Sequence, residues 1–199
     1  MNFNMPPVTQ ALVIANISIY LLQLLTGNSL IFWFALWPLG DGSLFAPWQL
    51  ITYSFLHGGL AHIFFNMYAL FMFGSEIERL CGARWYLAFY SVCVVTAALA
   101  QLAVAAYTNA PPYPTIGASG GVFGLLLAFG MYFPRRMLML IFPPIPMPAW
   151  LFVTLYGVLE LYLGVTGVAP GVAHFAHLGG MVGGYLMIRQ RRGFRRRRR

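Results

Sequence analysis

Seven polar or ionisable side chains lie in stretches of the chain that are otherwise almost wholly apolar. They are His57, His62, Asn66, Ser119, Glu160, His174 and His177. A polar group inside a membrane span is costly, so each of them is a functional candidate. A serine beside a histidine base supports nucleophilic catalysis, and N–H donors in a low-dielectric cavity stabilise a developing oxyanion. These residue types supply the parts of a serine hydrolase, provided that the fold brings them together.

The composition indicates that these residues belong to a membrane protein. Of 199 residues, 60% are hydrophobic, 17% aromatic and 8% charged, and the mean hydropathy is +0.73. Soluble domains carry about 25% charged residues. The composition therefore excludes a water-soluble globule, a disordered chain and a soluble nucleic-acid binder.

Six apolar stretches approach the length of about 20 residues that a bilayer-crossing helix needs. They cover about 8–25, 59–75, 85–107, 119–133, 148–165 and 172–188. We therefore expect an all-α, polytopic membrane bundle of six transmembrane helices over 1–188, followed by an Arg-rich tail over 189–199. Because no Arg or Lys precedes Arg79, the first stretch is not expected to be a cleaved signal peptide.

The basic residues predict the orientation of this bundle. All 12 are arginines, and eight of them lie in 189–199. The other four, Arg79, Arg84, Arg135 and Arg136, follow the second and fourth spans, so all twelve fall on one side. The positive-inside rule makes that side cytoplasmic, together with both termini. We expect the tail to bind anionic lipids rather than nucleic acid.

The loops on the opposite side, 28–58, 108–118 and 166–171, hold a single formal charge, Asp41. The first of them is rich in phenylalanine and tryptophan. Aromatic rings prefer the headgroup level of a bilayer, so this loop is expected to lie in the membrane interface.

Three of the candidate side chains lie at comparable depth on different spans. His62, Ser119 and His177 precede the arginines at the inner ends of their spans by 17, 16 and 12 residues. At 1.5 Å per residue these separations are about 25, 24 and 18 Å, which places all three in the outer halves of their helices.

Glycines indicate how two of these spans approach each other. Gly120 and Gly124 follow Ser119, and Gly180 and Gly184 follow His177 on one helical face. Small residues four apart let helix backbones come close, which would bring His177 within reach of Ser119. The same glycines also fit ordinary helix packing around a structural histidine.

The remaining candidates leave alternatives open. His62 and Asn66 share a helical face and can donate hydrogen bonds, but Asn66 can equally cap a carbonyl while His62 packs. Glu160 can line a water-filled cavity or cap a helix. No Asp or Glu lies near the histidines in sequence and no H-E-x-x-H motif occurs, so neither a metal nor another cofactor is expected.

From about Trp48 to Gly184, the chain resembles the rhomboid intramembrane serine proteases. Four motifs carry the resemblance: His57-x4-His62-x3-Asn66, Gly74-x3-Glu78-x3-Gly82, Gly117-Ala118-Ser119-Gly120, and Ala176-His177-x2-Gly180-x3-Gly184. The last motif selects His177 over His174, because only His177 has glycine at the third and seventh following positions.

The resemblance implies a catalytic dyad, without a third acid, that cleaves transmembrane protein substrates. Ser119 would be the nucleophile and His177 the base, and the oxyanion would be stabilised by the Ser119 N–H, His62 and Asn66. Gly117, Gly120, Phe123 and Gly180 would support these groups.

Two positions depart from the family pattern. The family often has Trp-Arg in the first outer loop, where this chain has Trp48-Gln49. A tyrosine often stacks on the catalytic histidine, and Phe123 would keep that ring without its hydroxyl.

Two other functions compete with proteolysis. One is a non-catalytic rhomboid-like protein that binds transmembrane clients, although such members usually lose the serine or the histidine. The other is a small transporter, which the lack of an inverted repeat disfavours. The compact six-span form leads us to expect a bacterial inner membrane location.

Overall fold

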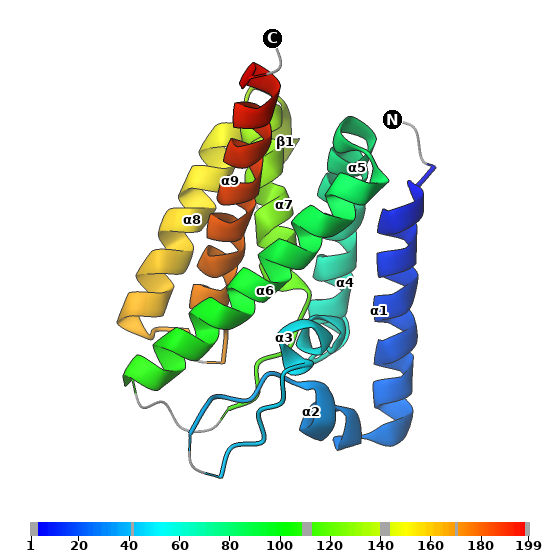
Figure 1. The fold of residues 1–199 in the computed structure, drawn as a ribbon, viewed down its shortest axis with the longest axis vertical. Helices are drawn as coiled ribbons and strands as arrows, with labels where there is room; N and C mark the ends of the chain where they lie inside the picture. Colours follow the sequence, from blue (N-terminus) through cyan, green and yellow to red (C-terminus); the bar gives the residue numbers. More distant parts are fainter. Residues whose placement is uncertain (1–3, 41, 109–112, 140–143, 170, 198–199) are drawn as a thin grey trace.

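The computed structural model describes residues 4–40, 42–108, 113–139, 144–169 and 171–197, and within these ranges the chain is a bundle of helices (Figure 1). The amino-terminal part contains α1 (Pro7–Thr26), α2 (Ser29–Phe34), α3 (Gln49–Thr52) and the 3₁₀ turn η1 (Tyr53–Phe55). The second span is α4 (Leu60–Ala69), the π-helical turn η2 (Leu70–Gly74) and α5 (Ser75–Cys81). The remaining helices are α6 (Ala83–Thr108), α7 (Ser119–Tyr132), α8 (Ala149–Thr166) and α9 (His174–Arg197). The strands β1 (Met137–Met139) and β2 (Pro146–Pro148) pair antiparallel between α7 and α8.

Most ends of the expected spans lie within a few residues of the ends of these helices. Four described helical stretches are long and apolar enough to cross a membrane: Pro7–Thr26, Leu60–Cys81, Ala83–Thr108 and Ala149–Thr166. The sequence predicts that the last span ends at residue 188, whereas α9 continues through the basic segment to Arg197. Asp41 and the end of the tail, residues 198–199, lie outside the described residues.

Helix α7 is the short helix at the centre of the bundle. Its 14 residues rise only about 21 Å, less than the roughly 30 Å of a bilayer core. Ten of its residues are buried, because α6, α8, α9 and η2 pack around it. The helix that begins at Ser119 is therefore held by protein rather than by lipid over most of its surface.

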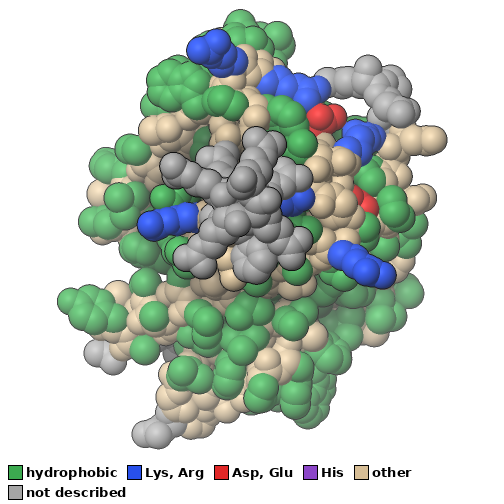
Figure 2. Space-filling model, turned by 45° about the horizontal axis from the view of Figure 1, so that its top comes forward, with side chains coloured by type: hydrophobic (Ala, Val, Ile, Leu, Met, Phe, Trp, Pro, Cys, Tyr) green, Lys and Arg blue, Asp and Glu red, His purple; other side chains and the backbone are tan. Residues whose placement is uncertain are grey.

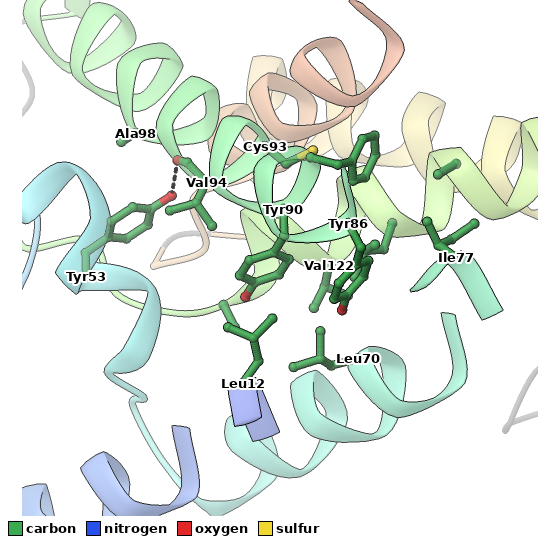
Figure 3. Packing of buried hydrophobic residues seen from close by; sticks show 14 of the residues in the cluster. Leu12, Tyr53, Leu70, Ile77, Tyr86, Tyr90, Cys93, Val94, Ala98 and Val122 are labelled. Carbon is green, nitrogen blue, oxygen red and sulfur yellow. Dashed lines mark hydrogen bonds between the residues drawn. The ribbon is translucent and has the colours of Figure 1, made fainter. Parts of the chain in front are cut away.

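The largest hydrophobic core lies between α6 and the helices of the amino-terminal half. Tyr86 and Tyr90 of α6 point toward Leu70 of η2 and Leu12 of α1 (Figure 3). Cys93 of α6 is buried on the side that faces α7, where a β-carbon at Gly124 would collide with its Sγ, and it is not joined to Cys81. Figure 3 also shows the Tyr53 hydroxyl donating to the Val94 carbonyl at 2.8 Å, which ties η1 to α6.

The arginine side chains that the structure describes gather at the end of the bundle where both termini lie (Figures 1 and 2). Arg79 and Arg136 both pair with Glu76, at 3.3 and 2.7 Å, and Arg191 lies over the ring of Trp85 at 4.5 Å. Helix α9 begins at the opposite end (Figure 1). The six arginines whose side chains are described thus lie at one end of the bundle, as the sequence predicts.

The first loop is held together by a buried glutamine, Gln49. Its Oε1 accepts from the Trp37 N–H at 3.2 Å, and its Nε2 donates to the carbonyls of Trp33 and Leu44 at 3.3 and 2.9 Å. The amide therefore connects distant parts of the loop at the position where the family often has arginine. Trp33 and Trp48 leave much of their indole rings exposed.

Candidate active site

Ser119 is the first residue of α7 and is presented by a tight turn of the backbone. Gly117 has φ +127°, a conformation that residues with a side chain rarely adopt, and its N–H donates to the Tyr53 carbonyl at 2.9 Å. The first N–H groups of a helix have no partner within the helix. The turn therefore presents the Ser119 hydroxyl and its backbone N–H at the same helix end.

His177, in the first turn of α9, lies against Ser119. Its Nε2 is 2.8 Å from the Ser119 Oγ, and the imidazole is buried. Glycines allow this approach: a β-carbon at Gly180 would collide with the Gly120 carbonyl, and one at Gly124 would lie 3.1 Å from the Gly180 carbonyl. The structure thus brings together two residues that are 58 positions apart in sequence.

Phe123 stacks on the imidazole of His177. The two ring centroids are 4.2 Å apart and the planes differ by 6°. Because Phe123 is one turn after Ser119 on α7, the helix that carries the serine also fixes the plane of the histidine ring.

The second ring nitrogen of His177 has a carboxylate partner, which differs from the dyad implied by the family resemblance. Glu160 Oε2 lies 2.8 Å from His177 Nδ1 and 2.7 Å from His174 Nδ1. All three side chains are buried. Through these two contacts Glu160 joins α8 to the start of α9.

His62 borders the serine from the other side. A β-carbon at Gly117 would lie 2.8 Å from His62 Cε1 and Nε2 and 3.7 Å from Ser119 Oγ. The Gly58 N–H donates to His62 Nδ1 at 3.3 Å, so the ring proton of neutral His62 is on Nε2, the nitrogen beside Gly117.

Asn66 is buried one helical turn beyond His62. Its Nδ2 donates to the His62 carbonyl at 2.9 Å. This bond is the capping of a carbonyl that the sequence left open as the alternative to an oxyanion role. An amide nitrogen carries two protons, so one N–H remains beyond this bond.

Glu160, His174 and His177 also form a group that could hold a metal ion, since their ligand atoms lie within 4.8 Å of one another. Three protein ligands is the number found in catalytic zinc sites. The Nδ1 atoms of both histidines are, however, already hydrogen-bonded to the carboxylate. Hydrogen bonds within this group of three side chains therefore already use these two nitrogen atoms.

Sequence reasoning missed the roles of Tyr53 and Glu160 in building this site. Tyr53 bonds both Gly117 and α6, and a β-carbon at Gly120 would lie 3.3 Å from its hydroxyl. No motif or spacing in the sequence indicates this role of Tyr53. The sequence does indicate that Glu160 has a polar contact, because a lone acid in an apolar span needs a partner.

The fold and site fit one class of membrane protein, and comparison with known families identifies it. Residues 45–192 match the family model described as the Rhomboid domain. The chain therefore belongs to the rhomboid family, whose members include proteins named as proteases, and it is an integral membrane protein.

Named relatives come from bacteria and plants. The chain is 29% identical over 140 residues to Rhomboid protease GluP of Bacillus subtilis (strain 168), covering 69% of this chain and 25% of that protein. It is 25% identical over 181 residues to Rhomboid protease GlpG of Yersinia pestis (strain Pestoides F), covering 91% and 61% respectively. RHOMBOID-like protein 4 of Arabidopsis thaliana is 31% identical over 145 residues, covering 70% and 33%. The chain thus spans a quarter to about three fifths of the length of these relatives.

Proposed function

We propose that the chain is a serine endopeptidase that hydrolyses peptide bonds in or near the transmembrane segments of other membrane proteins. The observation that carries this proposal is the 2.8 Å contact between Ser119 Oγ and His177 Nε2. A hydroxyl paired with an imidazole is what nucleophilic acyl transfer requires. Membership of the rhomboid family, with relatives named as proteases, supports the same conclusion.

In the first half of the reaction Ser119 Oγ attacks the scissile carbonyl carbon while its proton moves to His177 Nε2. The tetrahedral intermediate then collapses, the C–N bond breaks, and His177 gives the proton to the leaving amine. In the second half a water molecule gives a proton to His177 and attacks the acyl-serine ester. The C–O bond to Ser119 breaks, Oγ regains a proton from His177, and the new carboxyl terminus leaves.

The oxyanion of each intermediate would be stabilised by the backbone N–H of Ser119 and by the side chains of His62 and Asn66. His62 supports this assignment because its Nδ1 is occupied by the Gly58 N–H, which leaves Nε2–H as a donor beside Gly117. Asn66 retains one N–H beyond its bond to its own helix. A single donor of this kind contributes about 10²–10³-fold to the rate.

We place the Arg-bearing end of the bundle in the cytoplasm, with both termini, because positive residues favour that side. Cleavage then occurs near the outer leaflet, since His177 lies 12 residues, or about 18 Å, before Arg189 on α9. The Arg-rich segment 189–199 would contact anionic lipids of the bacterial inner membrane.

The test is cleavage of reporter proteins, each with one transmembrane segment, by the full chain in proteoliposomes. We expect the wild type to cut some of them, and Ser119→Ala and His177→Ala each to abolish the cut. Ser18→Ala, at an exposed serine of α1, is the matched control and should cleave normally. Retained activity in Ser119→Ala or His177→Ala would overturn the proposal, while tight binding of the reporters without cleavage by the wild type would favour a client-binding protein.

A further inference from the structure

Glu160 is the buried acid next to the proposed base, and it takes no part in the proton transfers between Ser119, His177 and the substrate. It lies on α8, 14 and 17 residues before the two histidines that it contacts. Its side chain is 8% exposed, against 7% for His174 and 10% for His177. A carboxylate so enclosed is costly unless hydrogen-bonded donors compensate for its charge, and here both donors are imidazoles.

The contact to His177 fixes which ring nitrogen carries the proton. A carboxylate only accepts hydrogen bonds, so Glu160 Oε2 at 2.8 Å requires the proton of neutral His177 to be on Nδ1. Nε2 then presents a lone pair to Ser119 Oγ, also at 2.8 Å. This is the tautomer that can accept the serine proton, whereas the other one would direct an N–H at the hydroxyl.

The same contact compensates the charge that develops during the reaction. When Nε2 takes the serine proton, His177 becomes an imidazolium. An anion in hydrogen-bond contact with Nδ1 stabilises that cation, and more strongly here than in water because the two side chains are only 10% and 8% exposed. Phe123 already fixes the ring plane, so the carboxylate adds orientation within that plane and charge.

His174 holds the carboxylate in place. Its Nδ1 lies 2.7 Å from the same oxygen, Glu160 Oε2, and its Nε2 lies 3.3 Å from the Ala169 carbonyl. Because a neutral imidazole carries one ring proton, a His174 that donates from Nδ1 to Glu160 has no second proton for that carbonyl, so the shorter bond to Glu160 is the one that holds the ring. Gly164 lets the start of α9 pack closely on α8, because a β-carbon there would lie 3.2 Å from the His174 β-carbon.

We propose that Glu160 is a positioning residue for His177, making Ser119, His177 and Glu160 a connected series, with His174 as the side chain that orients the carboxylate. This inference rests on the proposed function, since it assigns Glu160 a part in the same reaction. It differs from the family resemblance, which implies serine and histidine alone.

The test measures the rate at which a fluorophosphonate labels the full-length protein in proteoliposomes, over a range of probe concentrations. Glu160→Gln keeps the shape of the side chain and removes its charge. We expect its maximal labelling rate to fall about 100-fold, while the half-saturating probe concentration stays within about twofold. Glu160→Asp should recover part of the rate. Val158→Ala, at an exposed position of the same helix, is the matched control and should label like the wild type.

A second readout does not depend on a variant that folds. In wild-type protein carrying ¹⁵N-labelled histidine, the ring resonances of His177 should show the proton on Nδ1. A proton on Nε2 would overturn the inference, as would a wild-type labelling rate in Glu160→Gln when labelling still requires Ser119 and His177. Failure of the folded wild type to label at all would instead overturn the proposed function.

Discussion

Gly180 of α9 packs directly onto the backbone carbonyl of Gly120 in α7, with no space between them for a methyl group. Ser119 precedes Gly120 by one residue, and His177 precedes Gly180 by three. The distance between the two helices at this point therefore sets the distance between the proposed nucleophile and base. Glycine here has a positional role that no larger residue can fill.

We expect Gly180→Ala to inactivate the protein and to destabilise it by about 1–3 kcal/mol, the usual range for overpacking a well-packed site. The backbone of α7 or α9 must move to admit the methyl group, which separates Ser119 from His177. Gly157→Ala is the matched control, because the nearest atom to its β-carbon is the flexible end of Met181 at 3.4 Å. Thermal unfolding and reporter cleavage would be measured on both; normal cleavage by Gly180→Ala would contradict the packing argument.

Removing the proposed donor His62 is expected to lower kcat about 100-fold with little change in KM, because the donor acts on charge that develops in the transition state. The measurement is reporter cleavage by His62→Ala. Phe64→Ala, at an exposed position of the same helix, should retain the wild-type kcat. A rise in KM at unchanged kcat would show that His62 binds substrate instead.

The buried amide of Gln49 is expected to stabilise the first loop. Gln49→Ala removes its three hydrogen bonds, each worth about 0.5–1.5 kcal/mol, although the Trp33 carbonyl keeps the bond from the Trp48 indole N–H. Its unfolding temperature should fall well below that of Ile51→Ala, which truncates an exposed neighbour. Equal unfolding temperatures for the two variants would mean that the loop does not depend on the amide.

Acid should destabilise the protein through His57, which lies between η1 and α4. Burial, with a contribution from neighbouring His62, lowers the pKa of His57 to about 4, from an ordinary value of 6.5. The unfolded state then binds more protons than the folded state between these values, so stability falls as the pH drops from about 6.5 to 4. The ring faces Tyr20 and His62, with centroids 6.4 and 5.1 Å away.

Unfolding temperatures recorded across this pH range would test the effect of His57. His57→Gln should lose part of the dependence, because it removes the group that takes up the proton. A pH dependence identical to that of the wild type would assign the effect to other groups.

Much of the fold and part of the site could be predicted from the sequence. The apolar stretches and the clustering of arginines at one end indicated a helical membrane bundle, because both signals are properties of single segments. The depth of Ser119 and His177 and the glycines after them indicated that these two spans approach each other. The arrangement of the side chains around His177 could not be predicted, because it depends on tertiary contacts and not on the periodicity of any one segment.

Glu160 illustrates this limit. Its position in an apolar span showed that it needs a partner, but the contact with His177 joins residues 17 apart across the loop between α8 and α9. Gln49 shows the same limit of sequence-based prediction in the first loop. The departure from the family's arginine was visible, whereas the three backbone groups that its amide satisfies come from separate parts of the loop.

The most direct test of the central claim is to locate the adduct that a fluorophosphonate forms with the purified full-length protein, using mass spectrometry of its peptides. We predict one modified residue, Ser119, with labelling lost in both Ser119→Ala and His177→Ala while Ser18→Ala labels normally. Labelling that persists in folded His177→Ala at the wild-type rate, or an adduct on a different serine, would contradict the pairing of Ser119 with His177 as nucleophile and base.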